Sequence, residues 1–391
     1  MLRLKRGRER ARVHPWIFKG EVADVGAVEP GGAVTVVDAA GRFVGRGLYN
    51  PRPTLCCRIL TWIDEPIDAR VIERRVDQAL ALRAAAAGGR TDATAPSAGR
   101  LVWSEADGLP GFVADRYGLV LVVQCFTLGM ARLRHDLVRA LRDRLGDLAV
   151  FSADDAAGAA LEGFTPALGW LDRPGPDSLE VAEGGVSLAV TFGRGHKTGL
   201  YLDQADNRRR VGALAAGRDV LDVFAYTGAF ACHALRGGAR RAVCIESSAA
   251  ASAGARANLE RNGVADRADV REANAFDELR RLEREQARFG LVVLDPPPFA
   301  RSRTSLAAAL RGYKEVNLRA MRLLAPGGVL ATFSCSHHVS EERFVETCRA
   351  AAADAGVRLR VEASLGPARD HPVVLTVPET RYLKGLLLEA A

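Results

Sequence analysis

Short apolar runs, broken by glycine and proline, dominate the first part of the chain. They cover residues 32–38, 42–49 and 55–62. Several short strands separated by turn residues are typical of a small β-barrel. From residue 67 to 87 the apolar positions instead recur every three or four residues, which predicts one amphipathic helix. The stretch after this helix, up to Gly99, is expected to be an exposed loop.

The middle of the chain, from Leu101 to about Val190, alternates apolar strand patterns with a single helical one. Its predicted helix spans residues 131–145, and its clearest strands are 111–115, 119–125 and 186–191. This mixture predicts a small α+β domain.

The last part of the chain alternates apolar strands with amphipathic helices. The strands cover residues 219–224, 241–246, 291–295 and 328–333. Such alternation predicts an α/β fold with a doubly wound, mostly parallel sheet, which binds ligands beyond the carboxyl ends of its strands. We therefore expect three domains, bounded at residues 1–70, 71–192 and 193–391.

Composition agrees with a chain of several domains, because 391 residues with 48% hydrophobic side chains can bury a sizeable core. The formal net charge of +7 favours a polyanionic partner. Basic side chains crowd residues 1–19, where Glu9 is the single acid. A solvated surface or a loose terminus explains such a run equally well.

The seven cysteines show no CxxC pair and no Cys/His spacing suited to zinc, so we expect neither a metal site nor a disulfide framework. No apolar run approaches the roughly 18 residues that span a bilayer. The first residues also lack the apolar core of a signal peptide. A cytoplasmic protein without membrane contact is the expectation.

Polar residues follow the first two strands of the predicted parallel sheet. Asp222, Thr227 and Gly228 come at or just after the first strand, and Glu246 ends the second about twenty residues later. A glycine after a strand lets a helix N-terminus approach a ligand, and the spaced acid is placed to bind ribose hydroxyls. The alternative is a plain strand-turn-helix with a surface glutamate.

Two further strand ends carry reactive groups. Asp295 opens a rigid Pro-Pro-Pro-Phe299 turn, and Cys335 lies between two serines after the next strand. A nucleophile and an acid on adjacent strand ends are typical of a catalytic site. A capped aspartate and a small buried cysteine, as we expect for Cys232 and Cys244, are the structural alternatives.

A segment before the sheet, residues 195–204, adds polar groups. Lys197 and Arg208 could neutralise phosphate or the cofactor carboxylate, and Tyr201 could stack on a base. A loop that enters a helix explains this segment equally well.

Taken together, six motifs resemble the bacterial 23S ribosomal RNA large-subunit methyltransferase I family over essentially the whole chain. They are Gly195-His-Lys-Thr-Gly-Leu-Tyr-Leu-Asp-Gln204, Phe224-Ala-Tyr-Thr-Gly228, Asp295-Pro-Pro-Pro-Phe299, Arg311-Gly-Tyr-Lys-Glu315, Phe333-Ser-Cys-Ser336 and Tyr382-Leu-Lys-Gly385. The resemblance implies an N-terminal PUA-like RNA-binding domain, a central α+β domain and a Rossmann-like class I methyltransferase domain that forms 5-methylcytosine.

The resemblance also implies a cofactor, a substrate and their contact residues. The cofactor would be S-adenosyl-L-methionine, and the partner 23S rRNA or the large ribosomal subunit, with a homodimer left open. Cys335 and Asp295 would be catalytic. The cofactor pocket would comprise Asp222, Phe224, Tyr226, Thr227, Gly228, Glu246, Asn274, Asp295 and Gln204, and RNA would contact Arg3, Arg10, Arg12, Lys197, Tyr201 and Arg208.

A thiol is needed for this chemistry because C5 of cytosine is a poor nucleophile until a thiolate adds at C6. Cys335 suits that addition, and Asp295 could hydrogen-bond the ring as charge develops. The base that removes the C5 proton is not assigned. Two alternatives remain: a related guanine-N7 methyltransferase, which needs no thiol, and a non-catalytic RNA-binding ribosome-assembly factor. A small-molecule or protein methyltransferase would leave the basic N-terminal segment without a use.

Overall fold

The computed structural model describes residues 1–7, 13–86, 98–193, 199–300 and 305–391. The chain divides into two compact units. The first comprises residues 1–181, 190–202 and 369–380, and the second residues 182–189, 203–368 and 381–391. The expected division at residues 70 and 192 stays a prediction. Within the described ranges, no helix is both long and apolar enough to cross a bilayer.

The first unit begins with a six-stranded sheet of order β2-β6-β5-β4-β1-β3. The three predicted strands are confirmed as β4, β5 and β6, while the three short strands at the sheet's other positions were not predicted. Leu2, Ile17 and Ile59 supply buried side chains to its core. The strands are β1 Leu2–Leu4, β2 Trp16–Phe18, β3 Val22–Val25, β4 Ala33–Val37, β5 Phe43–Tyr49 and β6 Leu55–Thr61.

A five-stranded sheet of order β11-β10-β9-β8-β7 follows, with α1 (Ala69–Ala86) and α2 (Leu128–Leu145) packed beside it. Helix α2 begins three residues before its predicted start because the Thr127 hydroxyl accepts a hydrogen bond from the Met130 amide and caps the helix. The strands are β7 Ala98–Trp103, β8 Phe112–Tyr117, β9 Val120–Cys125, β10 Ala149–Ala153 and β11 Leu168–Trp170.

Two expectations for this region were wrong. Most of the loop predicted up to Gly99 lies outside the described residues, and its last two residues, Ala98 and Gly99, instead belong to β7, which pairs with β8. A second helix, α3 (Ala156–Glu162), also forms, capped by the Asp155 carboxylate, which accepts from the Gly158 amide. The alanine-rich composition of this segment favours a helix, but its shortness leaves little periodic signal.

A hairpin of β12 (Ser178–Glu183) and β13 (Val186–Thr191) follows the five-stranded sheet in the chain. Its two turn residues, Gly184 and Gly185, have φ angles of +56° and +83°. Two left-handed residues are what the common two-residue hairpin turn requires, and glycine adopts them without strain. Residues 182–189, which include Glu183 and this turn, belong to the second unit.

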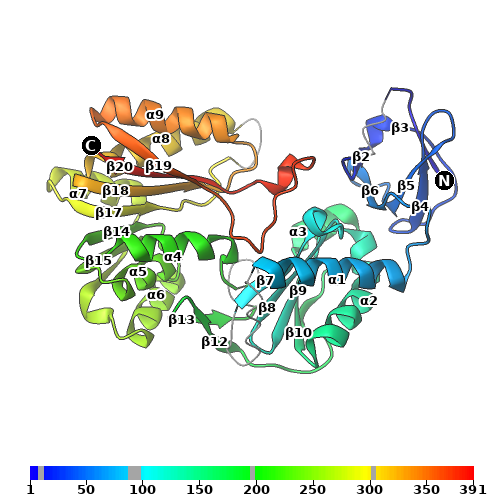
Figure 1. The fold of residues 1–391 in the computed structure, drawn as a ribbon, viewed down its shortest axis with the longest axis horizontal. Helices are drawn as coiled ribbons and strands as arrows, with labels where there is room; N and C mark the ends of the chain where they lie inside the picture. Colours follow the sequence, from blue (N-terminus) through cyan, green and yellow to red (C-terminus); the bar gives the residue numbers. More distant parts are fainter. Residues whose placement is uncertain (8–12, 87–97, 194–198, 301–304) are drawn as a thin grey trace. The chain divides into compact units, whose positions relative to one another are not determined.

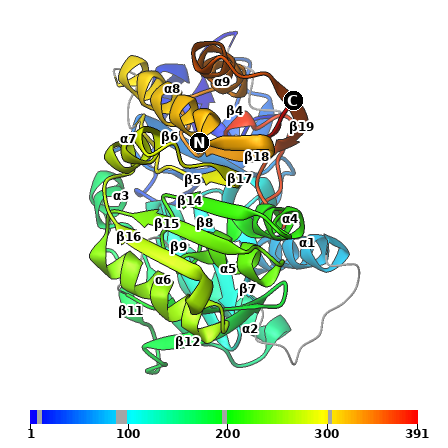
Figure 2. The same cartoon turned by 90° about the vertical axis from the view of Figure 1, so that its left-hand side faces the viewer.

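The second unit is a doubly wound α/β structure, as predicted. Its seven-stranded sheet has the order β16-β15-β14-β17-β18-β20-β19, parallel except at β20. Helices α4, α5 and α6 cover one face and α7, α8 and α9 the other (Figures 1 and 2). The strands are β14 Asp219–Val223, β15 Arg241–Glu246, β16 Ala268–Glu272, β17 Phe289–Leu294, β18 Leu324–Ser334, β19 Leu359–Leu365 and β20 Lys384–Ala390. The helices are α4 Ala205–Leu214, α5 Ala229–Arg236, α6 Ala249–Arg261, α7 Ala275–Arg284, α8 Leu306–Arg322 and α9 Glu341–Ala355.

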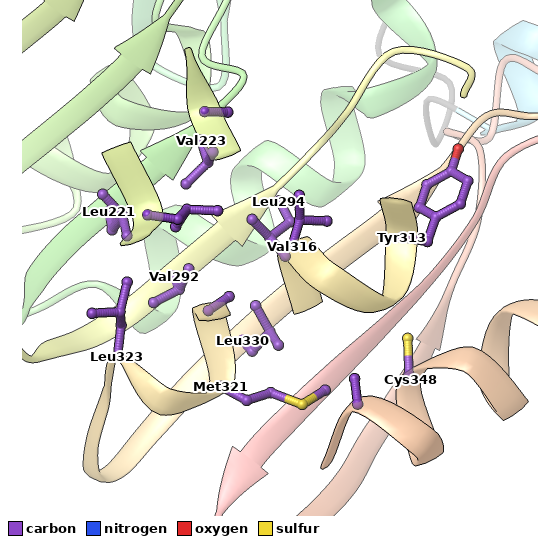
Figure 3. Packing of buried hydrophobic residues seen from close by; sticks show 14 of the residues in the cluster. Leu221, Val223, Val292, Leu294, Tyr313, Val316, Met321, Leu323, Leu330 and Cys348 are labelled. Atoms are coloured by element: carbon purple, nitrogen blue, oxygen red, sulfur yellow. The ribbon is translucent and has the colours of Figure 1, made fainter. Parts of the chain in front are cut away.

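The core on the α8 face fixes the strand ends relative to one another. Leu221 and Val292, from the neighbouring strands β14 and β17, pack in the same cluster as Val316 and Leu323 of the α8 region (Figure 3). Tyr313 belongs to the cluster too, and its hydroxyl points away from the aliphatic side chains (Figure 3). Burial of many apolar side chains makes these strands the most rigid part of the unit, so residues that follow them are held in place.

Candidate cofactor and catalytic site

The four strand-end groups lie at one edge of the sheet. Strands β15, β14, β17 and β18 are parallel, and their last paired residues are in register: Val223 pairs with both Ile245 and Leu294, and Leu294 with Thr332. The reactive side chains occur within a few residues of these pairs. The register therefore brings Asp222, Glu246, Asp295 and Cys335 to the carboxyl edge, where parallel sheets bind ligands.

The turn after β14 has an unusual backbone. Phe224 and Tyr226 have positive φ angles, +63° and +49°, although neither is glycine. Gly228, which begins α5, has a φ of +72°, and a Cβ there would lie 3.1 Å from the Ala255 Cβ. Left-handed backbone at bulky residues costs on the order of 1–3 kcal/mol each and is concentrated at ligand-binding sites. The turn is thus shaped for a ligand rather than for local stability.

Glu246 ties this turn to the neighbouring strand. Its two carboxylate oxygens accept hydrogen bonds from the Tyr226 amide at 2.9 Å and the Ser248 amide at 2.8 Å. Oε1 also accepts from the Ser247 hydroxyl at 3.5 Å, whereas Oε2 retains a lone pair for a further donor. Glu246 is half-buried, so a hydroxyl of a ligand can reach it.

Asp222 is a buried acid whose charge is only partly compensated. Its side chain is 1% exposed, and Oδ2 accepts a hydrogen bond from the Ala231 amide at 3.1 Å. Among the described residues Oδ1 has no hydrogen-bond partner, and the same holds for the buried Thr227 Oγ1 and Gln204 Nε2. Burial, together with the charges of Asp295 and Glu246, raises the pKa of Asp222 to about 7.

This raised pKa predicts a pH-dependent stability. Because the folded protein holds the Asp222 proton up to about pH 7 and the unfolded chain only up to about pH 4, stability falls as pH rises through this window. Asp222→Asn removes the carboxyl group and therefore this loss of stability at high pH. We expect its free energy of unfolding, relative to the unchanged chain, to rise by about 4 kcal/mol between pH 4 and pH 8. Urea unfolding of both proteins at several pH values measures this, and a difference that does not vary with pH would contradict it.

Asn274 begins α7, and its side-chain oxygen caps the helix. Oδ1 accepts hydrogen bonds from the amides of Phe276 at 2.9 Å and Asp277 at 3.4 Å. The residue is exposed, so a contact with a ligand would come from its side-chain nitrogen. The expected cofactor role stays a prediction, and the capping role was not foreseen.

Asp295 is half-buried at the start of a loop that packs on aromatic rings. The Phe299 ring, four residues later, lies 4.7 Å from the Tyr313 ring and 6.1 Å from the Phe224 ring, measured between centroids. The Asp295 amide donates to the Val223 carbonyl at 3.4 Å. Aromatic packing and proline thus restrict the loop on both sides of the acid.

Cys335 differs from the other cysteines in exposure. All seven cysteines lie in described residues, six of them are buried, and Cys335 alone is partly exposed. Burial raises the pKa of Cys125, Cys232 and Cys348 to about 12, so these thiols stay neutral and behave as small apolar groups. The Cys335 thiol donates to the Pro296 carbonyl with Sγ at 3.8 Å, which places it beside the Asp295 loop.

Family comparisons agree with this geometry. The model of the S-adenosylmethionine-dependent methyltransferase family matches residues 103–369, more than half of the chain. The chain belongs to this family. A PUA-like domain model matches residues 2–62, the region of the six-stranded sheet. The predicted family, fold class and cofactor, S-adenosyl-L-methionine, are therefore confirmed.

Two relatives with higher sequence identity identify a narrower family for the chain. The chain is 38% identical over 390 residues to ribosomal RNA large subunit methyltransferase I of Erwinia tasmaniensis, which covers 98% of this chain and 97% of that protein. It is 37% identical to the protein of the same name from Alteromonas mediterranea, over 100% of this chain and 98% of that one. The chain is thus a member of the ribosomal RNA large subunit methyltransferase I family within the S-adenosylmethionine-dependent methyltransferases.

Solved structures share the fold at low sequence identity. A putative methyltransferase solved in complex with SAH superposes with a TM-score of 0.84 at 18% identity, over 100% of both chains. A putative methyltransferase from Streptococcus mutans gives the same score at 17% identity, over 99% of both chains. These likenesses extend over the whole chain and therefore support its complete fold.

The residues expected to bind RNA are spread over the methyltransferase chain. Arg3 is half-buried on β1, and its guanidinium donates to the Ala39 carbonyl at 3.3 Å. Tyr201 is half-buried as well. Arg10, Arg12 and Lys197 lie outside the described residues.

Arg208 does not fit the expected phosphate contact. Its side chain is 3% exposed, and Nε and Nη2 donate to the two carboxylate oxygens of Glu183, both at 2.6 Å. His233 Nε2 lies 3.0 Å from the same carboxylate. A phosphate would have to displace a buried bidentate ion pair, so Arg208 is a structural residue, and the expectation of RNA contact is corrected.

Two residues at the site were not assigned from the sequence, although both lie in motifs that carried the family resemblance. The Tyr313 hydroxyl lies 2.9 Å from Ser336 Oγ, and Lys384 Nζ donates to the Ser336 carbonyl at 2.7 Å. Both therefore hold the residue that follows Cys335. Their motifs signalled importance, but a role required the tertiary contact.

Proposed function

We propose that this methyltransferase transfers a methyl group from S-adenosylmethionine to C5 of a cytosine in 23S rRNA, with Cys335 as the covalent nucleophile. Membership of a ribosomal RNA methyltransferase family supports the substrate class. One structural observation supports Cys335 as the nucleophile: it is the partly exposed thiol at the ligand-binding edge of the sheet, next to the Asp295 loop.

The strand-end residues offer groups that complement the cofactor. Asp222 Oδ1, buried and lacking a partner among the described residues, suits an ammonium donor, which would also compensate the buried charge. Glu246 Oε2 has a lone pair for a ribose hydroxyl. We assign the pocket to these two acids, to Phe224, Tyr226, Thr227 and Gly228 of the strained turn, and to Gln204, Asn274 and Asp295. When bound, S-adenosylmethionine supplies the methyl group as an electrophile.

Side chains of the protein itself would act on the cytosine ring. The Cys335 thiolate adds to C6, a C–S bond forms, and the ring double bond's electrons make C5 nucleophilic. Asp295 hydrogen-bonds N3 or the exocyclic amine as charge develops on the ring. After methyl transfer, loss of the C5 proton restores the C5–C6 double bond, the C–S bond breaks, and Cys335 leaves as a thiolate. The base that takes this proton is not assigned.

The N-terminal PUA-like region would help bind the RNA, with Arg3, Arg10 and Arg12 contributing charge. Lys197 and Tyr201 would contact RNA nearer the methyltransferase region. Phosphate contacts position the nucleic acid without specifying its sequence, whereas an aromatic ring can stack on an unpaired base.

A guanine-N7 methyltransferase is the alternative within the same fold class. It would have no need for a thiol at the sheet edge, because N7 is already nucleophilic. A non-catalytic RNA-binding factor would have no need for the strained turn and the buried, partly uncompensated Asp222. The thiol therefore favours the cytosine reaction over the guanine one, and the strained turn with Asp222 favours an enzyme over a non-catalytic factor.

A covalent trap tests the proposal. The protein is incubated with S-adenosylmethionine and 23S rRNA that contains 5-fluorocytosine, and the products are separated on a denaturing gel. Fluorine at C5 blocks the final elimination, so we expect a protein–RNA adduct that persists on the gel. The adduct should form with Cys232→Ala, whose thiol is buried, and should be lost in Cys335→Ala.

Two outcomes would count against the proposal. An adduct that persists in Cys335→Ala would place the nucleophile elsewhere. The absence of any adduct, combined with methylation of ordinary RNA, would indicate guanine-type chemistry.

A further inference from the structure

The turn after Cys335 is held from two sides. Ser336 Oγ lies 2.9 Å from the Tyr313 hydroxyl of α8 and accepts from the Ala300 amide at 3.4 Å. Its carbonyl accepts from Lys384 Nζ at 2.7 Å, and the Val339 carbonyl accepts from the same Nζ at 2.6 Å. Ser336 thus connects the Asp295 loop, α8 and β20 at the residue next to Cys335.

Strand pairing brings Lys384 to this place. Lys384 is the first residue of β20, and it pairs with Ser334, the last residue of β18 and the residue before Cys335. The antiparallel register therefore places the lysine beside the chain segment that carries the thiol. No parallel strand of this sheet could begin at the edge where β18 ends.

The ammonium group of Lys384 is buried and has no carboxylate partner in the part of the chain that the structure describes. Its residue is 3% exposed, and its hydrogen bonds go to two uncharged carbonyl groups. No salt bridge to Lys384 occurs among the described residues. Burying a charge without a counter-ion is costly, so such lysines usually serve a function. Burial is the largest effect and lowers the pKa of Lys384 to about 8, although the charges of the nearby Cys335 and Glu341 act in the opposite direction.

We propose that Lys384 is the positioning residue for Cys335: it anchors the 336–339 turn through two carbonyl groups, and its ammonium charge stabilises the Cys335 thiolate. This inference rests on the proposed function, in which that thiolate attacks cytosine. The thiol proton passes to solvent, which the partly exposed Cys335 reaches, and Lys384 keeps its own three protons. No co-reactant is needed.

Other titratable groups face this pair. Tyr313 from α8 lies close enough for Cys335 to raise the pKa of its hydroxyl, although burial is the larger cause. The charge of Glu341, at the start of α9, raises the pKa of Lys384. Asp295 follows the neighbouring strand β17 and, when charged, opposes a thiolate. In the turn itself, His337 stacks on the Tyr382 ring with centroids 5.6 Å apart, and His338 is the next residue. Lys384 is the lysine from a neighbouring strand whose charge favours the ionised thiol.

Alkylation of Cys335 tests, without RNA, whether Lys384 stabilises the thiolate. The rate of reaction of the folded, full-length protein with iodoacetamide is measured from pH 5.5 to 9.5, with Cys335→Ala to identify the signal. We expect the unchanged protein to titrate at least one pH unit below the ordinary thiol value of about 8.5. Lys384→Met should shift the profile upward by at least one unit, so that alkylation at pH 7 is roughly ten-fold slower.

Matched variants separate charge from packing. Lys384→Arg keeps the cation and should keep the rate at pH 7 within about three-fold of the unchanged protein. Lys314→Met removes a lysine of α8 that pairs with Asp354, and it should leave the profile unchanged. Methylation by Lys384→Met should be impaired at pH 7 and recover in part at pH 9, whereas a purely structural role would give a loss that does not vary with pH.

Each result has a distinct meaning. An unshifted alkylation profile in folded Lys384→Met would overturn the role of Lys384 even if the 5-fluorocytosine adduct forms. A shifted profile without any adduct would leave the pairing of lysine and thiol intact and overturn the proposed cytosine chemistry. If Lys384→Met does not fold, the unchanged protein still tests the inference. Titration of its Cys335 at or above about pH 8.5 would contradict the role of Lys384.

Discussion

Cys335→Ala is expected to lower the rate of cytosine methylation by roughly 10⁴-fold or more. Loss of a covalent nucleophile removes the reaction path itself, and comparable losses occur when other enzymes lose theirs. Binding of S-adenosylmethionine should change less than about three-fold, because the residues that we propose for the pocket, at β14 and β15, are untouched. Single-turnover methylation of 23S rRNA and calorimetric titration with the cofactor measure the two quantities.

Cys232→Ala serves as the matched control. Cys232 is fully buried in α5, so its loss should reduce stability through packing and leave methylation per folded molecule within a few-fold. Retained methylation in Cys335→Ala would rule out the covalent mechanism. Equal loss of activity in both variants would show that the effect comes from folding and not from chemistry.

Glu183→Gln is expected to lower the free energy of unfolding by about 3–5 kcal/mol. Glu183 is the shared acceptor for Arg208 and His233, and the Arg208 residue is 3% exposed. These partners hold the pKa of Glu183 well below its usual range although burial opposes this. Removing the carboxylate leaves a buried cation without its counter-charge, which costs more than the pair itself contributes.

Two further variants make the measurement specific. Arg208→Met combined with Glu183→Gln removes both charges, and urea unfolding should show that it recovers part of the lost stability. Asp147→Asn breaks a solvent-exposed pair with Arg173 and should have no measurable effect. A Glu183→Gln protein as stable as the unchanged one would mean that the ion pair does not hold the hairpin residue to α4 and α5.

Four strands of the second unit could be predicted because each carries its signal locally. The apolar runs that become β14, β15, β17 and β18 are buried on both faces of a sheet and stand out against helical periodicity. Short elements such as β1, β11 and α3 were missed, because a few residues give no period to count. Their formation depends on partners elsewhere in the chain.

Among the site residues, Asp222, Glu246, Asp295 and Cys335 could be proposed from the chain alone. Each follows an apolar strand, and parallel strands place their carboxyl ends at one edge, so local patterns suffice to group them. Arg208 was misjudged because a basic residue near a polar loop looks like a phosphate ligand until its partner is known. That partner, Glu183, is 25 residues away.

Local patterns in the amino-acid order thus determined the four central strands of the sheet and the polar groups at their ends. Packing decided which charges are buried together: Arg208 with Glu183, and Lys384 with the turn after Cys335. The reason is physical. Strand and helix propensities act over a few residues, whereas the pKa of Asp222 and the surroundings of Lys384 depend on desolvation and on charges from distant segments.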